Sequence, residues 1–182
     1  MAEKKSILLL LPTLQLSGSS DTLNALKKKA AILPNANTAG LEDLAAGLEG
    51  KTVDSAALAG AEDVLLVVHG DESALAAALE AADRRTLIVV AAADGVAFSG
   101  LAINGKAGSV DRKVSAQDIA VTIATITDLP VSGNCTGATI YQVMKNPNLK
   151  LDEIKKLKEA LMRMESVIQR DNREPWDKHD CA

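Results

Sequence analysis

The chain has 182 residues, is 47% apolar but only 2% aromatic, and carries a formal net charge of −4. This length suits one domain that buries roughly 70% of the surface exposed by its unfolded chain. Few aromatic side chains and an acidic balance argue against a nucleic-acid partner, because such sites use stacking platforms and basic grooves. No apolar segment reaches the length of about 20 residues that a membrane helix needs, so we expect a cytoplasmic protein without a membrane partner.

Three continuous apolar runs, at residues 7–11, 64–68 and 87–92, predict β-strands. Runs that are apolar throughout, without polar alternation, are typical of strands covered on both faces, as in a parallel sheet. Helical patterns lie between the runs, and strand–helix alternation favours right-handed βαβ units. The predicted fold class is therefore α/β, a three-layer sandwich with a mostly parallel sheet.

The helices of this sandwich are predicted from apolar stripes and polar capping residues. The first stripe runs from Leu23 to Ala30, and the second helix ends at Gly50. The residues placed to cap helices are Ser20 or Asp21, then Asp71, then Ser115 with Asp118 in a capping box. A short helix is expected near residues 140–144.

A second piece follows the α/β domain of residues 1–145. Residues 146–171 predict a long amphipathic helix, and residues 172–182 a polar tail. The apolar side chains of this helix recur in alternating steps of three and four, which is the spacing of a narrow heptad seam. They are Ile154, Leu157, Leu161, Met164 and Ile168. This seam either packs on the chain's own domain or contacts a protein partner or a second copy. The pairing of Cys135 with Cys181 stays open.

The stretch from residue 87 to residue 131 contains several short motifs in a characteristic order. A buried strand runs into Asp94-Gly95, and a Gly-rich turn leads to a capped helix and a Leu-Pro ending. The residues that carry the pattern are Val114, Asp118, Ile119, Ala120, Thr122, Ile123, Leu129 and Pro130. This order resembles the C-terminal core of the alkaline phosphatase superfamily. There the strand runs into Thr-x-Asp-His-Gly, whose Asp and His bind catalytic metal, and Val-x-x-x-Asp-Ile-Ala-Pro-Thr-Ile opens the helix.

The resemblance covers most of residues 6 to 145 in shortened form and implies an alkaline phosphatase-like fold. It also implies that the residues of the catalytic metal site have been replaced. Ala91 stands where the family has Thr, Ala93 where it has the metal-binding Asp, and Asp94 where it has the His. Gly95 alone is kept from this phrase. The residues retained serve folding, and those replaced would serve catalysis.

Residues 35–40 are similar in position to the segment that delivers the family's nucleophile, and Thr38 is the matching residue. Amides at a helix N-terminus favour a phosphoryl group, and adjacent metal ions would activate the hydroxyl. The alternative is that Thr38 is only a helix cap.

Ligands of parallel α/β sheets bind beyond the carboxyl ends of the strands. The loops expected there are residues 13–20, 69–72 and 93–100. His69 could act as a lone acid or base. Together with Asp71 and Asp94 it could hold at most one oxygen-ligated divalent ion, although we favour no metal. The alternative is that His69 ends a strand and Asp71 caps the next helix.

Ser17, Ser19 and Ser20 precede a helix in a Gly-containing turn. Their backbone amides could cradle an anion, although the Lys of a P-loop is missing. The alternative is a flexible polar turn.

These patterns favour a catalytically inactive, alkaline phosphatase-like domain that acts as a binding or assembly module. Its partner would be another protein or a second copy, bound through the C-terminal helix. One alternative is a residual metal-dependent phosphate- or sulfate-ester hydrolase with Thr38 as nucleophile. The other is a sensor of an anionic, phosphorylated metabolite.

Overall fold

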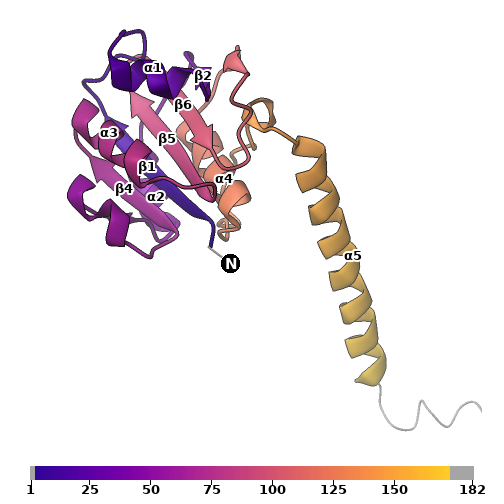
Figure 1. Cartoon of the computed structure of the whole chain (residues 1–182). Coiled ribbons are helices and arrows are strands. Elements are labelled where there is room, and N and C mark those ends of the chain that lie inside the picture. The colour runs from indigo at the N-terminus through magenta and orange to yellow at the C-terminus, as the bar shows by residue number, and fades with distance from the viewer. Residues whose placement is uncertain (1–2, 173–182) are drawn as a thin grey trace, which may run out of the picture. The chain divides into compact units, whose positions relative to one another are not determined.

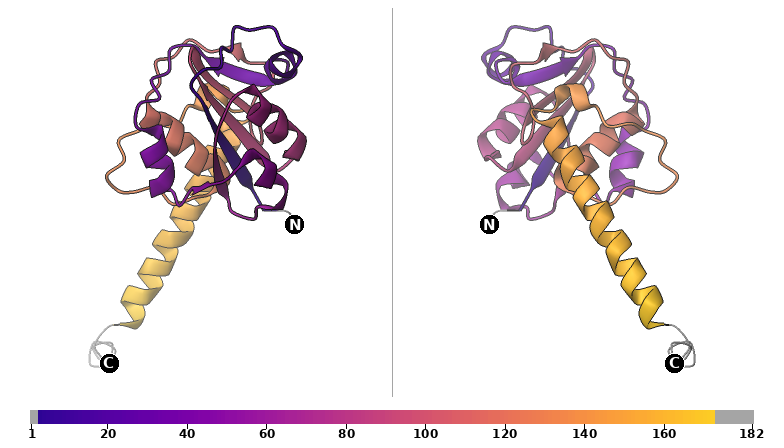
Figure 2. Two further views of the ribbon diagram at one scale, coloured as in Figure 1. Left: turned by 90° about the vertical axis from the view of Figure 1, so that its left-hand side faces the viewer. Right: turned by 90° about the vertical axis from the view of Figure 1, so that its right-hand side faces the viewer.

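The computed structural model describes residues 3–172 of the chain. The chain divides into two compact units, Met1–Lys145 and Asn146–Ala182. The first unit is α/β, with a seven-stranded, mostly parallel sheet in its described residues. The second contains the long helix α5 (Pro147–Asp171), which Figures 1 and 2 show as one uninterrupted helix. An α/β fold with a long C-terminal helix is what the sequence predicts.

The elements of the first unit follow one another in an order that departs from simple strand–helix alternation. In chain order they are β1 (Lys5–Leu11), α1 (Asp21–Lys27), β2 (Ala30–Leu33), α2 (Leu41–Gly47), β3 (Lys51–Thr52), η1 (Ser55–Gly60), β4 (Leu65–His69), α3 (Glu72–Ala81), β5 (Thr86–Ala92), β6 (Gly95–Gly100), β7 (Gly108–Ser109), α4 (Ala116–Thr127) and η2 (Tyr141–Val143).

The sheet has the order β3-β4-β1-β5-β6-β2-β7. Its centre is parallel: Leu8 of β1 lies opposite Val67 of β4 and Val89 of β5. All seven residues of β5 are buried. The continuous apolar runs of the sequence are therefore these central strands, because helices cover both faces and leave no face for polar side chains.

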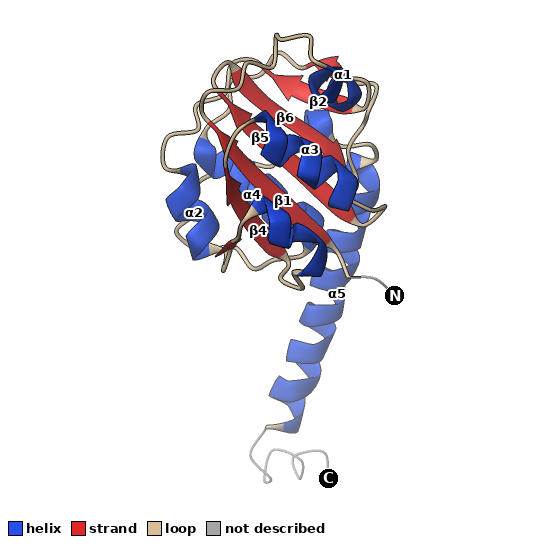
Figure 3. Cartoon of the chain, turned by 60° about the vertical axis from the view of Figure 1, so that its left-hand side comes forward, coloured by secondary structure: helices blue, strands red, loops and turns tan. Residues whose placement is uncertain are grey.

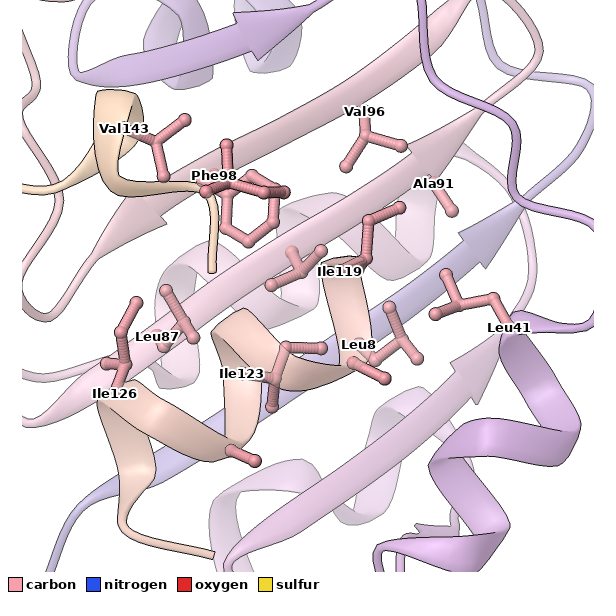
Figure 4. Close-up of a cluster of buried hydrophobic side chains, with 14 of the residues drawn as sticks. Leu8, Leu41, Leu87, Ala91, Val96, Phe98, Ile119, Ile123, Ile126 and Val143 are labelled. Carbon is pink, nitrogen blue, oxygen red and sulfur yellow. The ribbon is translucent and has the colours of Figure 1, made fainter. Parts of the chain in front are cut away.

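Two apolar cores lie on the two faces of the sheet. Alternate residues of each strand point to opposite faces, so Leu8 packs with helices α2 and α4, while Leu9 packs with α1, α3 and η1. Figure 2 shows the helices on both sides of the sheet, and Figure 3 shows α1 and α3 on one of them. Figure 4 shows the α4 face, where Ile119 and Ile123 lie over Leu8 and Leu87.

The prediction of a loop at residues 93–100 is wrong. After the turn at Ala93 and Asp94, the chain forms β6, which pairs antiparallel with β5. Gly95 has φ 152, and a Cβ built there would lie 2.7 Å from the carbonyl oxygen of Leu33. Glycine thus allows the hairpin to approach the end of β2. Because β6 contains Gly and Ser, its sequence lacks the continuous apolar pattern of the other strands, although its inner residues are all buried.

The expected extension of the first helix to Ala30 is also wrong. Helix α1 ends at Lys27, and Ala30 begins β2, which pairs antiparallel with β6. Two alanines open β2, so its apolar signal is weak and is easily taken for a helical stripe. Helix α2 ends at Gly47 and not at the expected Gly50, because the chain already turns at Glu49, whose φ is 62. Strands β3 and β7 have two residues each, too few for a periodic pattern.

The boundaries of the other predicted elements are confirmed. The three predicted strands are β1, β4 and β5, each within two residues of the expected ends. Asp71 is the N-cap of α3, and Ser115 and Asp118 form the expected capping box of α4. The expected short helix is η2, of 3-10 type. Cys135 is a free cysteine, whereas Cys181 and the predicted tail beyond Asn172 lie outside the described residues.

No helix within residues 3–172 is long and apolar enough to cross a membrane.

Candidate functional site

The loops that follow β1, β2, β4 and β5 leave the sheet at one edge. Strands β1, β4 and β5 are parallel, and β2 shares their direction because two antiparallel pairings through β6 separate it from β5. The carboxyl ends of parallel strands form the edge where ligands of such sheets bind. Asp94 and the loops 12–20, 34–40 and 70–71 therefore define the candidate site.

Asp94 connects two of these loops. Its Oδ1 accepts a hydrogen bond from the backbone amide of Leu16 at 2.6 Å, and its Oδ2 accepts one from the amide of Ser17 at 3.0 Å. The neighbouring amide of Ala93 donates to the carbonyl of Leu14 at 2.8 Å. Partial burial raises the pKa of Asp94, but the hydrogen bonds from Leu16 and Ser17 together outweigh it and hold the pKa below its usual value. Asp94 is thus a carboxylate that organises residues 14–17.

Ser20 and Asp71 both cap helices at this edge. Ser20 accepts from the amide of Leu23 at 3.3 Å, and its hydroxyl donates to the carboxylate of Glu72 in α3. Asp71 accepts from the hydroxyl of Ser73 at 2.6 Å and from its amide at 2.9 Å. Both bonds lower the pKa of Asp71, and the bond from the Ser73 hydroxyl has the larger effect. The alternative in which Asp71 caps a helix is confirmed.

Several polar backbone groups of the predicted anion cradle already have hydrogen-bond partners in the protein. The amide of Ser17 donates to Asp94, and the carbonyl of Ser19 accepts from the Asn24 side chain at 3.2 Å. The Lys27 ammonium donates to the carbonyl of Gly18. An external anion at Ser17 would have to displace the Asp94 carboxylate. Anion binding at Ser17, Ser19 and Ser20 stays a prediction.

His69 is the last residue of β4, as the structural alternative expects. Its Nε2 lies 2.9 Å from a carboxylate oxygen of Glu42 in α2, and both side chains are exposed. A contact so accessible to water contributes little to stability. The acid–base role predicted for His69 stays a prediction.

The resemblance implies a metal site at the end of β5, and the residues present do not fit it. Ala91 is buried among the apolar side chains that face α4 (Figure 4), and Ala93 offers no ligand atom. Both oxygens of Asp94 already accept backbone amides. Within residues 3–172 no three His, Cys, Asp or Glu side chains are grouped to hold a metal ion. A single ion at Asp71 and Asp94 stays a prediction.

Thr38 lies in the loop between β2 and α2 and is partly buried. Its carbonyl accepts from the amide of Leu41 at 3.0 Å. The N-cap of α2 is Gly40, with φ 82, so the alternative in which Thr38 caps this helix is wrong. The loop is held by Asn37, whose amide donates to the carbonyl of Val114 at 2.8 Å.

A groove next to Thr38 was not found from the sequence. It has a volume of about 480 Å³ and lies where α2 and α4 begin. Its lining residues are Asn37, Ala39, Gly40, Asp43, Leu44, Ser115, Ala116, Gln117 and Thr136. The Gln117 side chain accepts from the amide of Thr136 at 3.0 Å. Segments far apart in sequence meet here, and the capping box at Ser115 was the one local signal.

The loop after α4 approaches its first turn closely. A Cβ at Gly137 would lie 2.4 Å from the carbonyl oxygen of Gln117. Asp118 accepts from the amides of Ala138 at 2.8 Å and Ser115 at 3.1 Å. Burial raises the pKa of Asp118, but these hydrogen bonds and the Arg112 charge outweigh it and keep the pKa below its usual value. Asp118 therefore joins the N-terminus of α4 to the loop that contributes Thr136 to the groove.

The predicted partner-contact residues all lie on α5, and none of the residues of this helix is buried. Their exposed fractions are 47% for Ile154, 71% for Leu157, 56% for Leu161, 63% for Met164 and 53% for Ile168. Four further exposed apolar side chains on α5 were not predicted as contacts: Leu149, Leu151, Met162 and Val167.

Comparison of the chain with protein-family models, curated proteins and solved structures finds no match.

Proposed function

We propose that this chain is a catalytically inactive, alkaline phosphatase-like domain that serves as a binding or assembly module through α5. The observation that carries the proposal is the apolar seam of α5, whose five side chains are each 47% exposed or more. Apolar stripes of this size lower the free energy when another surface covers them.

The end of β5 supports the inactive half of the proposal. In the family that this sequence resembles, metal ligands stand at the positions of Ala93 and Asp94. Here the first is an alanine, and the second uses its charge to hold the backbone of Leu16 and Ser17. A two-metal hydrolase needs several carboxylates and imidazoles converging on ions about 3.5–4 Å apart. The alkaline phosphatase-like scaffold itself is proposed from the motif residues at 114–130.

A hydrolysis assay tests the inactive half. Purified chain would be incubated with an aryl phosphate or an aryl sulfate in the presence of Mn²⁺, Mg²⁺ or Zn²⁺. We expect the same background rate for wild type and Thr38→Ala. Turnover that Thr38→Ala abolishes would establish the residual hydrolase instead.

The mass of the chain in solution tests the assembly half. Light scattering after size exclusion should give a mass above the 19.0 kDa of one chain. A strict monomer with α5 protected from hydrogen exchange would mean that α5 packs on its own chain, and would overturn the assembly role.

The groove beside Thr38 favours a second candidate function, recognition of a phosphorylated small molecule. The hydroxyl or amide side chains of Ser115, Gln117 and Thr136 line it. A ligand present at a hundredfold its dissociation constant stabilises a protein by about 2.7 kcal/mol. Thermal shift with phosphorylated metabolites should show a rise that Thr136→Val removes. No rise with any compound would reject this candidate.

A further inference from the structure

Helix α5 has the geometry of one strand of a coiled coil. It spans 25 residues, which corresponds to about 37 Å at 1.5 Å per residue. Pro147 lies in its first turn, where proline is tolerated. A lone amphipathic helix gains most of its stability from packing its apolar face, and α5 is the one helix of the described part of its unit.

The seam fits one heptad register. With Ile154 at position a, Leu161 and Ile168 are also a residues, and Leu157 and Met164 are d residues. Ile at two of three a positions and Leu at the first d position favour a parallel, two-stranded coiled coil. This composition indicates that the partner covering the seam is another amphipathic helix with apolar residues at positions a and d.

Charge complementarity points to a second copy in the same direction. In a parallel, in-register pair, a g residue faces the e residue five positions further along the other helix. Glu153 at g then faces Lys158 at e of the other copy, twice by symmetry. Within one helix these two side chains are five residues apart and do not face each other.

The alternative direction leaves an apolar residue without an apolar neighbour. Two antiparallel pairings have the most apolar layers, four each. In the first, Leu161 faces Met164 and Leu157 faces Ile168, and in the second, Ile154 faces Met164 and Leu157 faces Leu161. Ile154 would face Asp171 in the first pairing, and Ile168 would face Lys150 in the second. The parallel pair keeps all five seam residues opposite their own copies, so it buries more apolar surface.

We propose that two copies of this chain associate through α5 in a parallel, in-register coiled coil, with Ile154, Leu157, Leu161, Met164 and Ile168 as its core. This inference rests on the assembly role proposed above and specifies its partner as a second copy. The face that carries Lys155, Lys156 and Glu159 remains in water.

A pair of neighbouring lysine substitutions in the full chain tests the seam. Leu161 and Met162 are similarly exposed, at 56% and 60%, but only Leu161 belongs to the seam. Wild type and Met162→Lys should sediment with twice the mass of one chain, whereas Leu161→Lys should sediment as a monomer. Lysine is a good helix former, so both variants keep the helix. A dimer that persists in Leu161→Lys overturns the inference but leaves the assembly role standing.

A charge exchange tests the direction. Glu153→Lys and Lys158→Glu should each raise the dissociation constant roughly two- to tenfold, because each breaks two exposed pairs. The double variant should restore it. Glu153 also lies 3.5 Å from Lys150 of its own helix, but loss of that contact would not be rescued at position 158. An effect of Lys158→Glu alone, without rescue, would overturn the parallel direction.

Cysteine cross-linking gives an independent reading of the register. With Cys135 and Cys181 replaced by Ser, Ile154→Cys should form an interchain disulfide under mild oxidation, because parallel copies place residue 154 opposite itself. Cross-linking only when Ile154→Cys chains are mixed with Asp171→Cys or Met164→Cys chains would show antiparallel pairing and overturn the inference. A wild-type chain that stays monomeric at every concentration overturns it as well.

Discussion

Asp94 Oδ1 lies 2.6 Å from the backbone nitrogen of Leu16, across 78 positions of sequence. The contact joins the turn after β5 to the loop after β1, so two strands that are neighbours in the sheet are also linked beyond their carboxyl ends. The family resemblance proposed above would place a metal-binding His at this position. Here a carboxylate and two amides satisfy each other, which makes the end of β5 a structural junction.

Replacement of Asp94 by Asn should destabilise the fold. It removes the charge that strengthens hydrogen bonds from Leu16 and Ser17, and bonds to charged groups contribute about 1.5–3 kcal/mol. Urea denaturation should show a loss of about 1–2 kcal/mol in the free energy of unfolding, because the Asn oxygen can still accept one bond. Asp54→Asn is the control, since the side chain of this N-cap residue makes no capping bond to η1. Equal stabilities of the two variants would contradict the structural role of Asp94.

The stability of the first unit should fall in acid through Asp94 and Asp118. Both have a pKa below the usual value in the folded protein, because amide hydrogen bonds outweigh the effect of burial. An unfolded Asp titrates near pH 3.9, so the unfolded chain takes up protons first as the pH falls. Their contribution is complete above about pH 5 and is lost as the pH falls through the folded pKa.

Urea midpoints measured from pH 7 down to pH 2 check this acid limb. The acid limb should be shallower in Asp94→Asn than in Asp54→Asn, because the former has lost one of the carboxyl groups whose pKa is lowered in the folded protein. If the slopes of the two variants agree, Asp94 is not a source of the pH dependence.

Gly100 should tolerate no side chain. It ends β6 with φ +93, and a Cβ there would lie 2.2 Å from the carbonyl oxygen of Thr86. Gly100→Ala should cost at least about 3 kcal/mol, from the strained backbone together with the clash. Gly47→Ala is the matched control, because its Cβ would meet nothing within 4 Å, and it should stabilise by about 0.4–1 kcal/mol. Thermal unfolding by circular dichroism separates the two, and a neutral Gly100→Ala would show that β6 ends differently.

Two buried threonines of α4 should respond differently to valine. The Thr122 hydroxyl donates to the carbonyl of Asp118 and also accepts from the amide of Ile140 at 2.9 Å. Thr122→Val leaves this buried amide unpaired and should cost about 1–3 kcal/mol. The Thr127 hydroxyl donates to the carbonyl of Ile123, which loses only a second donor in Thr127→Val, so that change should cost under about 1 kcal/mol. Equal losses in urea denaturation would contradict the link between α4 and residue 140.

The central strands and the helix caps could be predicted from the sequence because their signals are local. The runs of β1, β4 and β5 are apolar throughout, and Asp71 and Ser115 precede apolar stripes that begin within four residues. The seam of α5 is visible as a spacing alone, since a helical period places Ile154 and Leu157 on one face wherever the helix lies.

The outer half of the sheet could not be predicted in this way. Strand β6 contains Gly and Ser, and β2 begins with two alanines, so neither carries a strong apolar pattern. Both are strands because they pair with each other, and β6 also pairs with β5. Their direction also decides that the loop of Thr38 lies at the same edge as Asp94, which no local pattern could indicate.

What the sequence determined by itself is the α/β class, the central strands, the capped helices and the heptad period of α5, since each follows from neighbours along the chain. The tertiary structure alone decided the antiparallel β5–β6 hairpin, the groove between α2 and α4, and the use of Asp94. These depend on groups far apart in the sequence, and a carboxylate reveals its role only when its partners are known. At Asp94 the partners are backbone amides, and every residue but proline can supply one.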